Sequence, residues 1–311
     1  MCSEIVFEFP ELQGIMGGKY LKNEGFSKDV CLAVAEHYLP SFYKDALPST
    51  KYGAIVSIAD KIETLISIFI SGKRPSGSSD PYALRRNLNG VIKIIWNYEF
   101  DLPLDNLFKE LIDSWKISLP NLNFSKEKVL NDLNDFLVQR IFSHLEEISL
   151  NKELIKAVCT SDEVSQKRIL NLIDLKNRIK CIVDYKEKEI FVDIQNVITR
   201  VSKLANSSNL PTNIFSAEDY VNSNLFEKDC ELKVFEFIKE LEKLFQKEYC
   251  NYLKLLNLFE INIKTIENMF DSENGVLVMA EDIKIRNNRL NLLGLIRNYS
   301  LKIADFTLLS S

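Results

Sequence analysis

Apolar residues recur along this chain at the spacing of one face of an α-helix. Between residues 55 and 70 that face carries Ile55, Ile58, Ala59, Ile62, Leu65, Ile66 and Phe69, and between 130 and 141 it carries Leu130, Leu133, Leu137 and Ile141. Runs that alternate apolar and polar residues, as strands do, are scarce. The pattern predicts an all-α fold in which residues 55–70 form a buried helix. Asp60, Lys61 and Glu63 interrupt that run, which argues against a membrane span.

Turn and capping signals divide the chain into three predicted parts: a helical domain at 1–118, a helical connector at 119–190 and a C-terminal helical bundle at 191–311. The 10 glycines and 8 prolines concentrate in the first third, which indicates long helices with short connections afterwards. The individual signals are Ser125 as an N-cap, Thr160–Glu163 as a loop and helix start, Asn206–Asn213 as a loop, Ser216 with Asp219 as a capping box, and Asp271–Gly275 as a turn.

Composition bounds the classes of function. The 311 residues carry a net charge of −5, so nucleic-acid binding would have to rest on local cationic patches. Six cysteines are spread without a C-x-x-C pair, which indicates free thiols in a reducing compartment. The acidic residues in Met1–Phe9 do not suit a signal peptide. We therefore expect a cytoplasmic protein.

The segment Pro75–Arg86 combines a break, a helix start and a charge cluster. Asp80 is placed as an N-cap with Pro81 at the first helical position. Between Lys73 and Lys93 five cationic side chains face one carboxylate. A capped helix with solvated arginines is the plain interpretation, and a polyanion-binding patch is the functional one.

A second set of arginines lies in a strong helical pattern from 280 to 297. At 100° per residue, Arg286 and Arg297 are about 20° apart and Arg289 lies about 60° to the other side, so the three line one edge of the helix. Guanidinium groups suit phosphates and base edges. A structural role, including an i,i+4 pair of Asp282 with Arg286, is the other interpretation.

Motifs for catalysis or metal binding are missing from the sequence. Gly14–Lys19 lacks the first glycine and the hydroxyl of a phosphate loop, so we interpret it as a turn joining two helices. The two histidines, His37 and His144, are far apart and neither precedes an aspartate. We expect His37 at a helix end, and we expect no catalytic residue, no metal ligand and no cofactor bound by this chain.

Eight short blocks, in order along the chain, are the remaining signal. They are Glu8–Gly17, Ala35–Pro40, Leu47-Pro48, Ala59–Leu65, Pro75–Arg86, Val278–Asp282, Arg286-x-x-Arg289-Leu and Ala304–Phe306. Together these blocks resemble the β subunit of the bacterial heterotetrameric glycyl-tRNA synthetase. The first block and Asp80–Arg86 are the most specific, and between about 120 and 270 the resemblance rests on helical pattern alone.

The resemblance implies a particular piece of that subunit. The family's β subunit is roughly twice this length, so this chain looks like its C-terminal half. Residues 1–118 then resemble part of a degenerate HD-like domain, in which Asp60 matches the closing aspartate but the histidine partners are absent. Residues 191–311 resemble a DALR-like anticodon-binding domain. In this family catalysis belongs to the α subunit, which uses ATP and Mg²⁺.

The same resemblance implies the partners tRNA(Gly) and the α subunit, with no membrane and no DNA. It implies tRNA backbone contacts by Lys73, Arg74, Arg85 and Arg86, and RNA contacts by Arg286, Arg289 and Arg297. Our leading hypothesis is a non-catalytic, tRNA-binding portion of glycine–tRNA ligase. Two alternatives stay open: an HD-type metal-dependent phosphohydrolase, and a truncated assembly scaffold that does not bind RNA.

Overall fold

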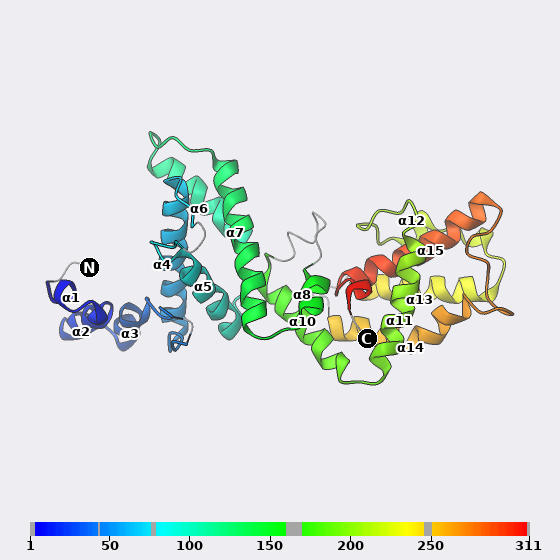
Figure 1. Cartoon of the computed structure of the whole chain (residues 1–311), viewed down its shortest axis with the longest axis horizontal. Coiled ribbons are helices and arrows are strands. Elements are labelled where there is room, and N and C mark those ends of the chain that lie inside the picture. Colours follow the sequence, from blue (N-terminus) through cyan, green and yellow to red (C-terminus); the bar gives the residue numbers. More distant parts are fainter. Residues whose placement is uncertain (1–3, 43, 76–78, 160–169, 246–250, 310–311) are drawn as a thin grey trace. The chain divides into compact units, whose positions relative to one another are not determined.

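The computed structural model describes residues 4–309 except 43, 76–78, 160–169 and 246–250 (Figure 1). Within these residues the regular elements are all helices, which confirms the predicted all-α class. Their bounds are α1 Glu4–Glu8, η1 Pro10–Leu12, α2 Ile15–Asn23, α3 Lys28–Glu36, α4 Lys51–Ile70, α5 Leu84–Tyr98, α6 Leu104–Ser118, α7 Lys126–Glu147, α8 Lys152–Val158, α10 Leu172–Lys186, α11 Ile190–Ala205, α12 Ala217–Tyr220, η2 Ser223–Leu225, α13 Asp229–Phe245, α14 Tyr252–Asn268, α15 Ile283–Leu301 and η3 Phe306–Leu308.

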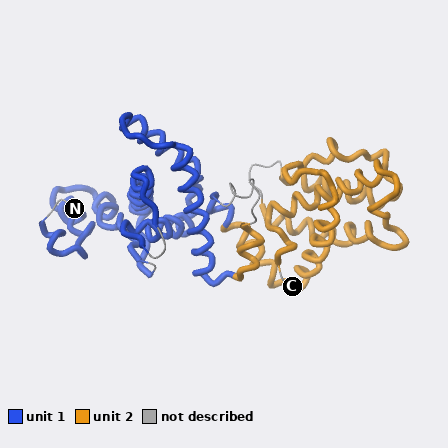
Figure 2. The backbone as a smooth tube through the Cα atoms, turned by 45° about the horizontal axis from the view of Figure 1, so that its top comes forward, with its two compact units in different colours: residues 1–150, 166–175 blue, residues 151–165, 176–311 orange. Residues whose placement is uncertain are grey.

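The chain divides into two compact units, shown in blue and orange in Figure 2. Unit 1 comprises residues 1–150 and 166–175, and unit 2 comprises residues 151–165 and 176–311. The three-part division at 118 and 190 stays a prediction. No described helix is long and apolar enough to cross a membrane.

Unit 1 is built around α4, which packs against α3, α5 and α7. The Thr50 hydroxyl caps α4 by accepting from the backbone N–H of Gly53 at 3.0 Å. Residues from Ile62 to Ile70 on the inner face of α4 are almost fully buried and supply much of the core. One part of the prediction for this helix is wrong: Ile55 is 54% exposed and Ala59 is exposed as well. The described chain covers the inner face of α4 but leaves this outer face open.

The helix after the Pro75 break begins later than predicted. Its first residue is Leu84, after Ala83, whose φ is +56°. The Asp80 carboxylate reaches across the intervening turn and accepts from the N–H groups of Leu84 and Arg85 at 2.8 and 3.0 Å. Asp80 therefore satisfies the first free N–H groups of α5, as a cap does, although three residues separate it from the helix.

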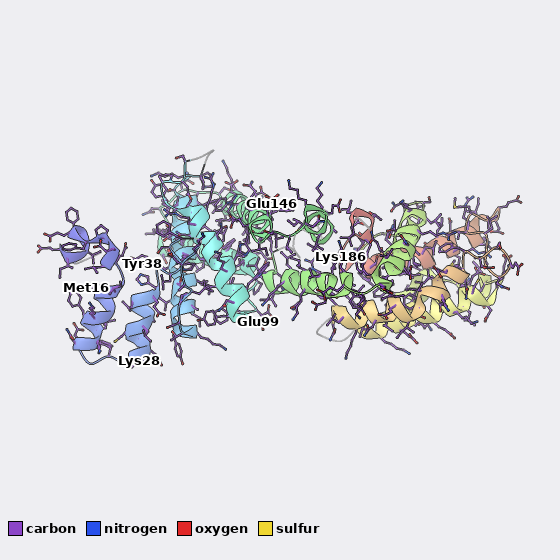
Figure 3. All side chains as sticks on the ribbon, turned by 60° about the horizontal axis from the view of Figure 1, so that its bottom comes forward. Met16, Lys28, Tyr38, Glu99, Glu146 and Lys186 are labelled. Carbon is purple, nitrogen blue, oxygen red and sulfur yellow. The ribbon has the colours of Figure 1, made fainter. Side chains whose placement is uncertain are left out.

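The glycines of Gly14–Lys19 serve helix packing. Gly14 has a φ of +80° and is the N-cap of α2. A Cβ on Gly17 or Gly18 would come within 2.9 Å of Val34 or 2.6 Å of the Cys31 carbonyl oxygen. Side chains are excluded there because α2 and α3 lie side by side, in the hairpin that starts near Met16 and ends near Tyr38 in Figure 3. The segment turns into a helix that packs on its neighbour, rather than simply joining two helices.

Unit 2 is centred on α15, which packs against α11 and α13. From Asn288 to Ser300 every residue of α15 except Asn291 is buried. The predicted loop at 206–213 and turn at 271–275 are present, and Asp271 accepts from two N–H groups of its turn. Ser216 precedes α12 but makes no side-chain cap bond. Thr160–Glu163 lies outside the described residues.

Several smaller predictions can also be compared with the structure. The Ser125 hydroxyl caps α7 by accepting from the Lys128 N–H at 3.3 Å, as predicted. His37 is the C-cap residue of α3, also as predicted. The four described cysteines, Cys31, Cys159, Cys181 and Cys230, are buried or half-buried and form no disulfide bond among the described residues.

Candidate nucleic-acid interface

Two of the predicted cations at the start of the Lys73–Lys93 cluster already have partners. Lys73 is exposed, and its ammonium donates to the Tyr82 hydroxyl at 2.5 Å. Arg74 donates to the carboxylate of Asp132 at 2.6 Å and to the Phe69 carbonyl at 2.7 Å. Arg74 therefore ties the end of α4 to α7, and engaging a phosphate would disturb that tie.

Arg85 and Arg86, at the start of α5, differ in surroundings. Arg86 is exposed, and its guanidinium lies 5.2 Å from the ring centroid of the exposed Phe42. Arg85 is half-buried beside Arg140 of α7: burial, and then the charge of Arg85, lowers the pKa of Arg140. Two guanidinium groups are thus held near one another on neighbouring helices.

The cluster extends along α5 and α7. Arg85, Asn89 and Lys93 recur at i, i+4 and i+8 and so share one face of α5. Within the described chain the buried Asn89 Oδ1 and Arg140 Nε have no hydrogen-bond partner. Sequence reasoning missed Arg140 because it lies in another helix, 55 residues after Arg85 by sequence number.

The sequence analysis assigned no structural role to Lys61, but the structure gives it one. It is 3% exposed, and its ammonium donates to the carbonyls of His37 and Tyr38 at 3.2 and 3.0 Å and to the Ser57 hydroxyl at 2.9 Å. Burial lowers the pKa of Lys61 to about 8, although the charge of Asp60 opposes the shift. At neutral pH the buried ammonium therefore binds the carbonyls that follow α3.

Gly90 of α5 packs closely on Lys61: a Cβ there would lie 3.1 Å from Lys61 Cε, so the lysine side chain would have to shift by a few tenths of an ångström. We expect Lys61→Met to destabilise unit 1 by about 1–3 kcal/mol, because buried carbonyls lose their donor. Urea unfolding followed by tryptophan fluorescence measures this, since both tryptophans, Trp96 and Trp115, lie in unit 1. Lys51→Met, on the exposed start of the same helix, should change the free energy of unfolding by less than about 0.5 kcal/mol. Equal effects of the two substitutions would contradict the role of Lys61.

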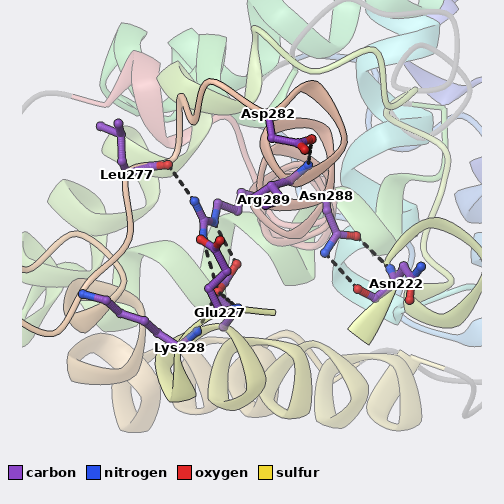
Figure 4. Close-up of polar contacts among 9 residues, drawn as sticks. Asn222, Glu227, Lys228, Leu277, Asp282, Asn288 and Arg289 are labelled. Carbon is purple, nitrogen blue, oxygen red and sulfur yellow. Dashed lines mark hydrogen bonds and ion pairs between the residues drawn. The ribbon is translucent and has the colours of Figure 1, made fainter. Parts of the chain in front are cut away.

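In unit 2 the structure places Arg289 inside the protein (Figure 4). Its side chain is 3% exposed; Nε donates to Glu231 at 2.8 Å, Nη2 to Glu227 at 2.6 Å and Nη1 to the Leu277 carbonyl at 3.0 Å. Burial alone lowers the pKa of Arg289, but the hydrogen bonds to Glu231 and Glu227 outweigh it and raise the pKa. Arg289 thus ties α15 to the start of α13.

Arg297 is buried as well, at 7% exposed. It donates to the carbonyls of Ala205 and Leu210 at 3.1 and 2.8 Å and to Asn298 Oδ1 at 3.1 Å. The Ala205 carbonyl belongs to the last turn of α11, where the helix dipole favours a cation. Burial lowers the pKa of Arg297.

The expectation that Arg286, Arg289 and Arg297 form one exposed edge is therefore corrected. Helical spacing placed them on one side of α15, but neighbouring helices cover most of that side. Arg289 and Arg297 have structural roles in this chain. Asp282 does not pair with Arg286; it caps α15 by accepting from the N–H groups of Lys284 and Ile285. Arg286 is half-buried, and its guanidinium has no hydrogen bond or ion pair within the described residues.

Where α15 lies beside the segments around Ser208 and Tyr220, the surface of unit 2 is hollowed. Two adjoining hollows of about 220 and 710 Å³ share Tyr220, Asn287 and Asn291 in their walls. The Asn288 amide braces the wall through two hydrogen bonds with the backbone of Asn222, at 2.7 and 3.0 Å (Figure 4). The larger hollow also carries Glu218, Asp219, Lys239 and Lys284. Amides and a tyrosine dominate this groove, and its charges are balanced.

No group of three or more His, Cys, Asp or Glu side chains among the described residues is placed to hold a metal ion. A family model described as glycyl-tRNA synthetase beta subunit matches residues 1–160 of the 311. The chain belongs to the glycyl-tRNA synthetase β-subunit family. This confirms the resemblance seen in the sequence at the level of the family.

Individual relatives agree with the family match. The chain is 34% identical to the glycine–tRNA ligase β subunit of Gloeothece citriformis and 35% identical to that of Trichodesmium erythraeum, over 98% of this chain and 43% of each relative. It is 36% identical to the Thermodesulfovibrio yellowstonii protein of the same name, over 99% of this chain and 42% of the relative. This member of the family therefore spans less than half the length of these relatives.

Proposed function

We propose that this chain is a non-catalytic, tRNA-binding portion of a glycine–tRNA ligase β subunit, corresponding to the C-terminal half of that subunit. Its partners are tRNA(Gly) and the α subunit, which attaches glycine to the tRNA with ATP and Mg²⁺ in the cytoplasm. The observation that carries the proposal is the match of nearly the whole chain to proteins named glycine–tRNA ligase β subunit.

The proposal keeps the three-part division. Residues 1–118 act as a degenerate HD-like scaffold, 119–190 as a connector and 191–311 as a DALR-like anticodon-binding domain. Lys61 supports the scaffold role: beside Asp60, a buried ammonium is bonded to backbone carbonyls and a hydroxyl. That arrangement holds helices together and needs no bound metal.

In unit 1 the tRNA backbone contacts are assigned to Lys73, Arg85 and Arg86, with Lys93 and Arg140 added from the structure. The carboxylates of Glu147 and Asp80 also act on Arg140, and phosphate groups would add to them in compensating the cations gathered on α5 and α7. Such contacts give affinity without sequence information. Arg74 contributes less, because its ion pair with Asp132 already occupies the guanidinium.

In unit 2 the groove formed by the two hollows that share Tyr220, Asn287 and Asn291 is assigned to unpaired bases. Asn287 is exposed and Tyr220 is 41% exposed, so an amide and an aromatic ring are available for base edges and stacking. Balanced charges in the groove suit a base better than a phosphate. Arg286 is not among the residues that line the groove, so it stays a separate candidate for an RNA contact. Arg297 supports one wall of the groove from inside by donating to the Leu210 carbonyl.

The tRNA proposal predicts that Arg85→Gln with Arg86→Gln weakens binding of a tRNA(Gly) transcript by about tenfold at low salt. Loss of two phosphate contacts should also make the slope of log K against log salt shallower by about 1.5. Filter binding over a salt series measures both quantities. The matched control removes two exposed lysines of α8, Lys152→Gln with Lys156→Gln, and should bind as the unmodified chain does.

Two outcomes would contradict the proposal at different levels. If the two double variants lost the same affinity for tRNA, only net charge would matter, and the assignment of Arg85 and Arg86 would be wrong. If the unmodified chain showed no salt-dependent binding of tRNA, the RNA-binding function would be wrong, and the assembly scaffold would be the remaining hypothesis.

A further inference from the structure

One face of α4 is apolar and uncovered. Tyr52 is 62% exposed, Ile55 54% and Val56 41%, and Ala59 one turn later is exposed too. These four residues follow the i, i+3, i+4, i+7 spacing of a single helical face. Their neighbours on the other side, Ala54, Ile58 and Ile62, form part of the core of unit 1. The first two turns of α4 are therefore apolar on both sides.

A helix that is apolar all round is ordinarily buried on all sides. Isolated exposed apolar residues are common, but here they are concentrated. Of the 26 large hydrophobic residues exposed in the described chain, 11 lie in residues 5–56. Helices α1, α2 and α3 add few buried hydrophobic residues of their own, namely Val6 and Ala33. This end of unit 1 exposes apolar surface that the described chain does not cover.

We propose that Tyr52, Ile55, Val56 and Ala59, here termed the α4 face, form the docking surface for the part of the β-subunit polypeptide that the relatives possess and this chain does not span. More than half of each relative lies outside the match, since the chain covers 42–43% of it. That unmatched part belongs to the same family protein, which makes it the occupant that we propose. The proposal does not depend on tRNA binding.

The chemistry of the α4 face favours a protein over RNA. The four side chains offer no cation for phosphates. The nearest charged residues along the helix are Lys51 before them and Asp60, Lys61 and Glu63 after them, and Lys61 is buried among the carbonyls that follow α3. An apolar stripe bordered by charges is the usual composition of a protein–protein interface core with its rim. A second copy of this chain would pair through the same stripe. The experiment below distinguishes such pairing from docking of the unmatched part of the β subunit.

The test compares this chain alone with a chimera that joins it to the region of the Gloeothece citriformis β subunit outside the match. A cysteine at Ile55 (Ile55→Cys) is labelled with a maleimide, and the labelled peptide is followed by mass spectrometry. We expect labelling at least tenfold slower in the chimera than in the chain alone. The control is Ile117→Cys, at a position 80% exposed in the same unit, whose labelling rate should be equal in both proteins.

A second measurement, thermal unfolding, tests the proposal if Ile55→Cys does not fold correctly. Tyr52→Asp should leave the Tm of the chain alone within about 1 °C, because Tyr52 is 62% exposed there, and should lower the Tm of the chimera by several degrees. Equal labelling rates and equal Tm shifts in the two proteins would overturn the proposal. Labelling of the chain alone that is slow and becomes faster on dilution would overturn it in favour of a second copy.

Discussion

Arg289→Met is expected to destabilise unit 2 by about 3–5 kcal/mol. The substitution leaves the Glu231 carboxylate, which is 0% exposed, without its guanidinium partner. Two backbone N–H groups, of Glu227 and Lys228, still donate to that carboxylate at 2.8 and 3.1 Å, but they do not neutralise its charge. Removing one partner of a buried ion pair has a large effect for this reason.

A second variant separates the stranded charge from lost packing. Arg289→Met combined with Glu231→Gln removes both charges, so its loss should be smaller than that of Arg289→Met alone. Arg286→Met on the same helix should change stability by less than about 0.5 kcal/mol, because its guanidinium has no bond within the described residues. Hydrogen exchange of α13 and α15 measures all three variants, since both tryptophans lie in unit 1. If Arg289→Met exchanged no faster than Arg286→Met, the structural role of Arg289 would be wrong.

Helices were predictable from the sequence because their signals are local. Apolar spacing over three or four turns identified α4 and α7, and Ser125 marked the start of α7 correctly. The start of α5 was placed too early because Asp80 and Pro81 imitate a cap and a first helical residue. The deciding feature is the positive φ of Ala83, a conformation that is uncommon for residues other than glycine and that the sequence does not announce.

Roles that depend on distant neighbours were not predictable. A helical wheel gives the direction of Arg289 but not the presence of Glu231, which lies 58 residues away along the chain. Lys61 counted only as a charge interrupting an apolar run, because the carbonyls that bind it are 22 to 24 residues earlier. The predicted arginine edge therefore failed, whereas the cations at 85 and 86, near the start of a helix, remained available for a partner.

On the α4 face, residues that the sequence predicts to be buried are exposed. The sequence pattern predicted burial of Ile55 and Ala59, and the described chain leaves both exposed. Periodicity reports what a helix buries in its complete assembly, whether the covering surface comes from the same chain or from another. This mismatch between the pattern and the structure is one of the observations on which the α4 face proposal rests.

Acidification should destabilise unit 1 through His144. Its imidazole is 3% exposed, 5.2 Å from the ring of Trp96, and its Nδ1 has no hydrogen-bond partner within the described residues. Burial, and then the charge of Lys93, lowers the pKa of His144 from 6.5 to about 4. Because the folded pKa lies below the unfolded one, the unfolded state binds the proton first. Stability is therefore full above pH 6.5 and falls as the pH decreases toward 4.

The size of this effect follows from the shift. One pKa unit corresponds to about 1.4 kcal/mol, so the contribution of His144 to the free energy of unfolding should decrease by about 3 kcal/mol between pH 7.5 and pH 4. Carboxylates also titrate in this range, and the difference between unmodified chain and variant removes their contribution. His144→Gln, which cannot take up the proton, should lose less stability than the unmodified chain over this interval.

Urea unfolding at a series of pH values, followed by tryptophan fluorescence, measures the difference in unit 1. The matched control is His37→Gln, which removes the other histidine; His37 is half-buried at the end of α3, with its Nδ1 2.7 Å from the Val34 carbonyl oxygen. That variant should keep the acid sensitivity of the unmodified chain, because His144 remains. Acid sensitivity that persisted in His144→Gln would mean that the buried imidazole is not the group that takes up the proton on unfolding.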